Sequence, residues 1–195
     1  MPGFFCEILA SSDLIIALVG MPGSGKSTVG RHLARRLRVG FVDSDHMIEE
    51  RLGCSIREFF SLSGEEAFRD LEQSVLDELT SRGTGTVLST GGGSVLRAAN
   101  RQHLRHRCQV IYLRSSPEEI FRRVRHDKNR PLLQVDDPLQ RLRDLYLVRD
   151  PLYRETAHFV IDTGRPSVST LVNMICMQLE LAGHLPAGDS DRHSV

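Results

Sequence analysis

The sequence predicts an α/β fold in which helices flank both faces of a five-stranded parallel sheet. Short apolar segments alternate with segments of helical periodicity along the chain, and helical connections of this kind join parallel strands. A glycine-rich loop separates the first apolar segment from the first helical one, as in nucleotide-binding sheets. The predicted strands are residues 14–19, 40–42, 86–89, 109–113 and 158–161.

Helical segments fill the intervals between the predicted strands. Pro117 suits the first turn of a helix that ends near Arg125, because the N–H that proline lacks would have no helical partner there. Residues 126–137 show little periodicity and are predicted to form a mobile loop. The predicted helices are residues 26–37, 45–52, 55–60, 65–81, 96–104, 117–125, 138–148 and 167–181.

The two ends of the chain differ from the rest. Residues 1–13 are expected to form a flexible extension, since they lack the basic start of a signal peptide and the long apolar core of a membrane span. Residues 183–195 are polar, contain Gly and Pro, and are expected to form a flexible tail. A single domain is therefore predicted over residues 14–182, long enough to bury a substantial core.

Charge and cysteine usage indicate a cytoplasmic enzyme that acts on small molecules. Lys plus Arg equals Asp plus Glu at 25 each, so no overall basic field favours a nucleic acid. We expect neither a nucleic-acid nor a membrane partner, and we expect a monomer. The cysteines follow no metal-binding or redox spacing and are expected to be small buried hydrophobic residues in a reducing compartment. They are Cys6, Cys54, Cys108 and Cys176.

Residues Gly20 to Ser27, with the sequence GMPGSGKS, form a complete phosphate-binding loop. An apolar strand precedes the loop and a helix follows it, which separates a nucleotide loop from a chance run of glycines. Its backbone N–H groups and the positive end of the helix dipole favour phosphate. Lys26 is expected to reach the β- and γ-phosphates, and the Ser27 hydroxyl to ligate Mg²⁺. The sequence therefore predicts binding of a nucleoside triphosphate.

Two further segments are expected to converge on this loop, because the carboxyl ends of parallel strands meet at one edge of a sheet. Asp43 and Asp45 follow the second strand: one carboxylate could hold Mg²⁺, and the other could accept the proton of an attacking hydroxyl. Asp45 also suits the N-cap of the next helix, and the two roles are compatible. Residues 91–93 are three glycines after the third strand; they describe either a flexible turn or a place where a ligand approaches bare backbone.

Arg69 is the predicted anion ligand on the helical segment 65–81. It shares a helix face with Glu72, three residues further on. An exposed pair of this kind would contribute little to stability. A pair that lies in the site would instead hold the guanidinium for a carboxylate or a phosphate.

Taken together, these residues resemble the shikimate kinases, a family within the nucleoside-monophosphate-kinase-like phosphate-loop enzymes. The resemblance runs from about Leu14 to Arg165 in family order. Many kinases share the phosphate loop, but the combination of motifs is specific to this family. The matching motifs are GxPGxGKST at 20–28, DxD at 43–45, GExxFRxxE at 64–72, GGG at 91–93, RPLL at 130–133 and RxPLY at 149–153.

The resemblance implies a phosphate-loop kinase fold with a mobile lid at about 126–137 and shikimate-binding helices at about 45–82. It also implies transfer of the ATP γ-phosphate to the 3-hydroxyl of shikimate, a step of chorismate and aromatic amino-acid biosynthesis, with Mg²⁺ as cofactor. Lys26, Asp45 and Arg130 would be catalytic, with Asp45 as the candidate base and Arg130 as a lid arginine.

The remaining implied roles concern the metal and the two substrates. Ser27 would ligate Mg²⁺, and Asp43 would do so through water. The residues implied for shikimate are Asp45, Arg69, Gly91, Gly92, Gly93 and Arg149. The residues implied for ATP are Gly23, Ser24, Gly25, Lys26, Ser27, Thr28, Arg123, Arg130 and Arg165. Within that set, Arg123 would pack on the adenine, and Arg165 belongs to a turn at 163–166 whose sequence departs from the usual family wording.

Two other functions remain open on the sequence. A different small-molecule or nucleoside-monophosphate kinase would share the fold, but a nucleotide acceptor needs an aromatic or apolar pocket and the chain has no Trp. A nucleic-acid-binding NTPase would use a basic stripe, for which zero net charge and the lack of interleaved aromatic residues offer little support. The candidate stripe is Arg122, Arg123, Arg125, Lys128 and Arg130.

Overall fold

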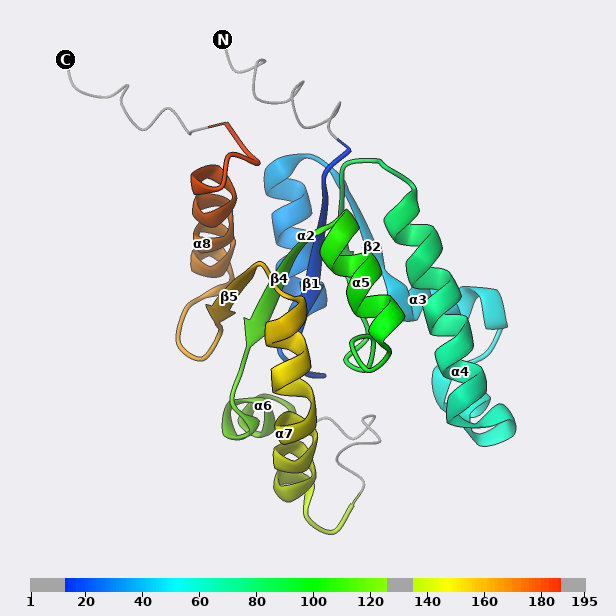
Figure 1. Cartoon of the computed structure of the whole chain (residues 1–195). Coiled ribbons are helices and arrows are strands. Elements are labelled where there is room, and N and C mark those ends of the chain that lie inside the picture. Colours follow the sequence, from blue (N-terminus) through cyan, green and yellow to red (C-terminus); the bar gives the residue numbers. More distant parts are fainter. Residues whose placement is uncertain (1–12, 126–134, 187–195) are drawn as a thin grey trace, which may run out of the picture.

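The computed structural model describes residues 13–125 and 135–186, which form a parallel sheet covered by helices (Figure 1). The five strands lie in the order β2-β3-β1-β4-β5, and every pairing is parallel. β1 is central, and the chain crosses from one side of it to the other between β3 and β4. The strands are β1 (Ile15–Val19), β2 (Gly40–Asp43), β3 (Thr86–Ser89), β4 (Gln109–Arg114) and β5 (Phe159–Asp162).

Seven helices are described, and they cover both faces of the sheet (Figure 1). They are α2 (Lys26–Leu37), α3 (Ser44–Leu52), α4 (Ile56–Ser81), α5 (Ala98–Arg107), α6 (Pro117–Val124), α7 (Pro138–Thr156) and α8 (Val168–Leu181). Ile15, Ala17 and Val19 of β1 belong to a core shared with α4, α5 and α7. Ile16 and Leu18, on the opposite face of the strand, belong to a core shared with α2 and α8. The continuous apolar run of β1 is thus explained by burial on both faces, and the predicted fold class is confirmed.

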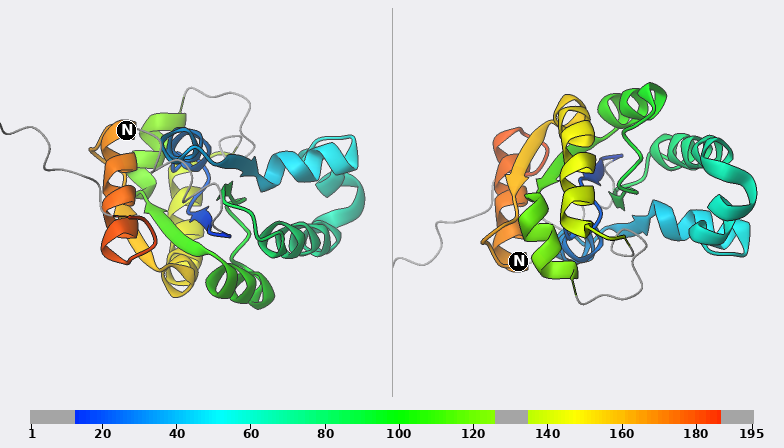
Figure 2. Two further views of the ribbon diagram at one scale, coloured as in Figure 1. Left: turned by 90° about the horizontal axis from the view of Figure 1, so that it is seen from above. Right: turned by 90° about the horizontal axis from the view of Figure 1, so that it is seen from below.

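α3 and α4 form an arm beside the sheet. Figure 2 shows this helical pair extending away from the sheet on the side of β2. Two helices, 55–60 and 65–81, were the expectation for this part of the chain; the structure joins them into α4 with a kink at Gly64 (φ 80°, ψ 177°). Glycine adopts this positive φ without the steric cost that a side chain would add. Residues 45–82, expected to bind the acceptor, therefore coincide with this arm.

α7 is longer than predicted. The expected helix ended near Val148, three residues before Pro151. Proline inside a helix removes one of its hydrogen bonds. In the structure α7 continues through Pro151 to Thr156. Tyr153 and Thr156, beyond the proline, are fully buried, and this packing offsets the missing bond. The extra turns carry the end of the helix to the site described below.

The structure tests the expected burial of the cysteines and the expected absence of a membrane span. Cys108 and Cys176 are buried, as predicted, and burial raises the pKa of the Cys108 thiol to about 12. Cys54 is only half-buried, at the junction of α3 and α4, so the prediction is wrong for this residue. Cys6 lies outside the described residues. No helix in residues 13–125 and 135–186 combines the length and apolar character needed to cross a bilayer.

Candidate active site

The phosphate loop joins β1 to α2 at the carboxyl edge of the sheet. β1 ends at Val19, and α2 begins at Lys26 with Gly25 at its N-cap in a left-handed conformation (φ 96°). The backbone between them turns tightly, with Ser24 N donating to Met21 O at 3.1 Å. The amino end of a 12-residue helix therefore faces the loop, an arrangement that favours anions.

Lys26 is folded back over this loop. Its Nζ donates to Gly20 O and to Met21 O, both at 2.9 Å, and the residue is 7% exposed. Ser24 is also buried, and its Oγ has no hydrogen-bond partner within the described part of the chain. The loop thus holds a buried cation and an unsatisfied hydroxyl at the point where the sequence predicts phosphate.

Ser27 and Asp43 are in direct contact beside the loop. Ser27 Oγ donates to Asp43 Oδ2 at 2.6 Å and lies 3.3 Å from Ser89 Oγ at the end of β3. Asp43 Oδ1 accepts from Asp45 N at 3.1 Å, so Asp43 is the N-cap of α3. The prediction that Asp45 caps this helix is wrong: Asp45 lies in the first helical turn, and its carboxylate is free of that task.

The carboxylate of Asp45 is more basic than that of an ordinary aspartate. Burial raises the pKa of Asp45 to about 6, and the neighbouring charge of Asp43 adds to the rise. Glu72 and Glu49 act in the same direction, whereas Lys26 opposes them. A carboxylate with a raised pKa inside a cleft is suited to general base catalysis.

The triple glycine lies between the phosphate loop and the arm, and each residue meets a different part of the site. A Cβ on Gly91 would lie 2.5 Å from Asp45 Oδ1, and one on Gly92 would lie 2.6 Å from Pro22 Cδ of the phosphate loop. A Cβ on Gly93 would overlap the guanidinium of Arg69. Close approach therefore explains the absence of side chains here, and the description of this segment as a merely flexible turn does not hold.

Arg69 and Glu72 are buried together under the triple glycine. Arg69 is 8% exposed and Glu72 is 1% exposed, with Arg69 Nη1 donating to Glu72 Oε2 at 2.7 Å. Arg69 Nη2 also donates to Glu65 Oε1 at 3.1 Å. The pair is therefore not an exposed ion pair, and Glu72 fixes the guanidinium in the site.

α7 contributes Arg149 and Tyr153 from the opposite side. Burial raises the pKa of Glu72, and the charges of Arg69 and Arg149 counter that rise, which puts Arg149 in the same electrostatic environment. Tyr153, one helical turn after Arg149, is fully buried, and its hydroxyl donates to Gly92 O. Two arginines and a tyrosine from distant segments thus surround the glycine loop.

Arg123 joins α6 to the turn that follows β5. Its guanidinium donates to Ser115 Oγ at 3.2 Å and to the carbonyl of Thr163. Arg165, in the same turn, lines a cavity of about 460 Å³ with Gly164 and residues of β4, α6 and α7. Both residues expected near adenine therefore lie at the carboxyl ends of β4 and β5, beyond the phosphate loop. Arg130 and most of the expected lid at 126–137 lie outside the described residues.

A single cleft of about 270 Å³ connects the phosphate loop to Asp45 and the triple glycine. The described residues that were predicted for the site but do not line this cleft are Ser24, Arg69, Gly91, Gly93, Arg123, Arg149 and Arg165. Within the described residues, no group of three or more His, Cys, Asp or Glu side chains is arranged to hold a metal ion. The lining residues are Pro22, Gly23, Gly25, Lys26, Ser27, Thr28, Asp43, Asp45, Ser89, Thr90 and Gly92.

Three residues that contribute to the site were not predicted from the sequence. Ser44 Oγ accepts from Gly91 N at 3.0 Å and so ties the amino end of α3 to the triple glycine. Ser89 contacts Ser27, and Tyr153 contacts Gly92, as described above. Ser44 and Ser89 could have been found from their position at strand ends, whereas the part played by Tyr153 depends on the unexpected length of α7.

Comparisons with known proteins agree on one family. The sequence model described as shikimate kinase matches residues 22–180. The shikimate kinase of Paracidovorax citrulli is 62% identical over 176 residues, which cover 89% of this chain and 96% of the relative. That of Ralstonia nicotianae is 54% identical over 182 residues, covering 92% and 95%. The solved structure of shikimate kinase from Acinetobacter baumannii in complex with shikimate has a TM-score of 0.85 and 47% identity, and the match covers 92% of this chain and 99% of that one.

Proposed function

The chain belongs to the shikimate kinase family of ATP-dependent kinases, and we propose that it transfers the γ-phosphate of ATP to the 3-hydroxyl of shikimate in the cleft between the phosphate loop and Asp45. One observation carries the proposal: a single cleft is lined by Lys26 and Ser27 on one side and by Asp45 and Gly92 on the other. A donor bound by the loop and an acceptor held by the arm would meet there. Phosphoryl transfer requires mainly such positioning and neutralisation of charge.

The triphosphate would bind across residues 23–28. The ammonium of Lys26 now donates to two neutral carbonyls. Exchange of these neutral acceptors for anionic β- and γ-phosphate oxygens would add the attraction between opposite charges to each hydrogen bond. Backbone N–H groups of Gly23 and Gly25, the hydroxyl of Ser24 and the side chain of Thr28 would complete the cradle. Arg123 and Arg165 would flank the adenine, and Arg130 would reach the transferring phosphate from the lid.

Ser27 and Asp43 fit a site for Mg²⁺. Their oxygens already lie 2.6 Å apart beside the phosphate loop, and Ser89 adds a second hydroxyl nearby. Mg²⁺ prefers oxygen ligands and keeps several waters, so one hydroxyl and one carboxylate beside a triphosphate suffice without an all-protein cage. Ser27 would ligate the ion directly and Asp43 through water. When bound, the ion would neutralise charge on the phosphate oxygens.

The acceptor would be held by the arm and by α7. Arg69 and Arg149 present planar guanidiniums, which match a carboxylate with two parallel hydrogen bonds, as lysine cannot. Glu72 holds Arg69 in place. Backbone groups of residues 91–93 and the carboxylate of Asp45 would meet the hydroxyl groups of the ring.

Asp45 would accept the proton of the attacking hydroxyl. Its raised pKa, about 6, leaves it mostly ionised at neutral pH yet more basic than an ordinary aspartate. As the hydroxyl oxygen bonds to the γ-phosphorus, the bond from that phosphorus to the bridging oxygen breaks, and the proton passes to Asp45. Lys26 lies on the phosphate side, where charge moves toward the bridging oxygen. We also propose that the protein acts as a monomer and that residues 14–182 form one kinase domain.

A coupled assay of ADP formation tests this function. ATP turnover is measured with shikimate, gluconate, a nucleoside monophosphate or no acceptor. We expect turnover with shikimate alone, and a product phosphorylated at the 3-hydroxyl by NMR. Comparable turnover of the nucleoside monophosphate would instead support a nucleotide kinase on the same fold.

A further inference from the structure

Arg97 lies at the start of α5, but its side chain does not stabilise that helix. It occupies the N-cap position and makes no side-chain cap hydrogen bond. Serine, threonine, aspartate and asparagine are favoured there, and a positive charge opposes the helix dipole at this end. The reason for an arginine at this position must therefore lie outside α5.

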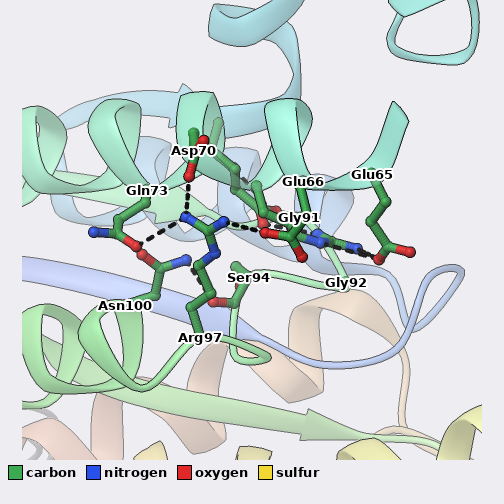
Figure 3. Close-up of polar contacts among 12 residues, drawn as sticks. Glu65, Glu66, Asp70, Gln73, Gly91, Gly92, Ser94, Arg97 and Asn100 are labelled. Carbon is green, nitrogen blue, oxygen red and sulfur yellow. Dashed lines mark hydrogen bonds and ion pairs between the residues drawn. The ribbon is translucent and has the colours of Figure 1, made fainter. Parts of the chain in front are cut away.

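The guanidinium of Arg97 reaches across to α4. It donates to Asp70 Oδ1 at 2.6 Å, to Glu66 Oε2 at 2.9 Å and to Gln73 Oε1 at 3.3 Å. These three acceptors occupy one face of the helix at i, i+4 and i+7. Figure 3 shows Arg97 extending to all three from the segment that follows Gly91 and Gly92. The planar, five-donor fork of arginine suits this three-point contact, and a lysine could not reproduce it.

The backbone of Arg97 is rigidly connected to the triple glycine. Ser94 N donates to Gly91 O at 3.1 Å and Leu96 N to Gly93 O at 3.0 Å, so the segment folds into consecutive tight turns. Asn100 Nδ2 donates to Ser94 O at 2.9 Å and fastens these turns to α5 (Figure 3). A shift of the Arg97 backbone relative to α4 would therefore also move the glycine loop relative to α4.

The position of α4 against this loop decides where Arg69 lies. Arg69 stands one residue before Asp70 in α4, and its guanidinium is seated directly on Gly93. The charge of Arg97 also acts on Glu72, the partner that fixes Arg69. Arg97 thus contacts the face of α4 next to the one that carries Arg69 and Glu72.

We propose that Arg97 is a positioning residue for acceptor binding: by joining the triple-glycine loop to Glu66, Asp70 and Gln73 of α4, it holds Arg69 where the acceptor carboxylate binds. The proposal rests on the proposed role of Arg69 in shikimate binding. Arg97 does not itself line the cleft. Its effect is on the affinity for the acceptor, and the nucleotide cradle, which is built on β1 and α2, does not depend on it.

The test compares Arg97→Gln with a matched variant of the same helix pair. Arg107, at the other end of α5, donates to Asp77 Oδ1 of α4 at 2.6 Å, far from the glycine loop. Arg107→Gln therefore removes a similar α5–α4 ion pair without touching the site. For each protein, kcat and the KM for shikimate and for ATP are measured, together with the melting temperature. Arg69→Lys is measured alongside as the reference for the acceptor site.

We expect Arg97→Gln to raise the KM for shikimate about 3- to 10-fold, since partly exposed ion pairs are individually weak but a displaced guanidinium loses its aligned contact. The KM for ATP stays within about twofold, and Arg107→Gln changes neither value beyond that margin. Arg97→Lys, which keeps the charge and loses the fork, gives only partial recovery. Asp70→Asn combined with Arg97→Gln is no worse than Arg97→Gln alone, because both changes remove one interaction.

Equal increases in both KM values for Arg97→Gln, an equal effect from Arg107→Gln, or no change in the KM for shikimate would each overturn the proposal. Failure of the underlying function looks different, since Arg69→Lys would then leave shikimate binding intact. If Arg69→Lys weakens shikimate binding and Arg97→Gln does not, the role of Arg69 stands and the positioning role of Arg97 is refuted.

Discussion

The phosphate loop and the acceptor site are built in opposite ways. The loop is one continuous stretch between β1 and α2, and the groups that it offers to a phosphate are mostly backbone N–H groups and one lysine. The proposed acceptor site draws side chains from α3, α4 and α7, which contact the triple glycine or lie near it. Local backbone geometry determines the phosphate loop, whereas the packing of distant segments determines the proposed acceptor site.

The two regions also differ in how their charges are prepared. Lys26 is held by neutral carbonyls that a triphosphate can replace. Arg69 is already paired with a buried carboxylate, so its orientation exists before any acceptor arrives. A cation that exchanges partners suits a highly charged ligand, whereas a preoriented guanidinium suits recognition of one carboxylate geometry. Changes in one region should therefore leave binding at the other nearly intact, and the following predictions test that separation.

The largest effect is expected from Asp45→Asn, which keeps the size of the side chain and removes the proton acceptor. Single-turnover transfer should fall by about 10²–10⁴-fold, the usual contribution of a general base. Nucleotide affinity should remain close to that of the unmodified protein, because the proposed role of Asp45 is toward the acceptor. Stopped-flow turnover and nucleotide titration measure the two quantities, and near-normal transfer would leave Asp45 with a binding role alone.

The pH dependence of kcat/KM for shikimate should reveal the same group. Burial raises the pKa of Asp45 to about 6. As the pH falls through that value the carboxylate gains a proton and can no longer accept one, so kcat/KM should fall about tenfold for each further pH unit. At higher pH the group stays ionised and the rate levels off.

Asp45→Asn provides the control for this profile. Its residual activity should lack the inflection near pH 6. If the inflection persists in Asp45→Asn, another group, such as the buried Glu72, is responsible for it.

Smaller and more selective effects are expected from two neighbouring glycine substitutions. Gly93→Ala places a methyl group against the Arg69 guanidinium, and Gly92→Ala places one 2.6 Å from Pro22 Cδ of the phosphate loop. Gly93→Ala should raise the KM for shikimate about 3- to 10-fold without affecting ATP, since the end of a long side chain can move aside. Gly92→Ala should raise the KM for ATP, because the proline ring is rigid.

Glycine-to-alanine substitutions at two adjacent positions are thus expected to affect the KM for different substrates. Steady-state kinetics with each substrate varied in turn gives the four values. If both variants affect both substrates equally, the glycine segment is a single structural unit, and the two regions are not independent.

The two regions also differ in how far the sequence predicts them. Lys26, Ser27, Asp43, Asp45 and the triple glycine could be predicted as neighbours, because each follows a strand of a parallel sheet and such strands end at one edge. The depth of burial of Arg69 and Glu72 could not, since helical spacing alone is equally consistent with an exposed pair. The predicted helix ended near Val148, whereas α7 continues to Thr156, so the position of Tyr153 was not predicted. The role of Arg97 could not be predicted from the sequence, because its partners lie on α4, which only tertiary packing brings close.

Calorimetric titration of Arg69→Lys with shikimate and, separately, with ATP tests the division between the two regions most directly. Lysine keeps the charge but loses the two-pronged contact and the fitted pair with Glu72, and disruption of a buried charge pair costs about 2–5 kcal/mol. We predict that shikimate affinity falls at least about 30-fold while ATP affinity stays within about twofold. An equal loss for both ligands would contradict the account, because Arg69 would then support the structure as a whole or belong to the nucleotide site.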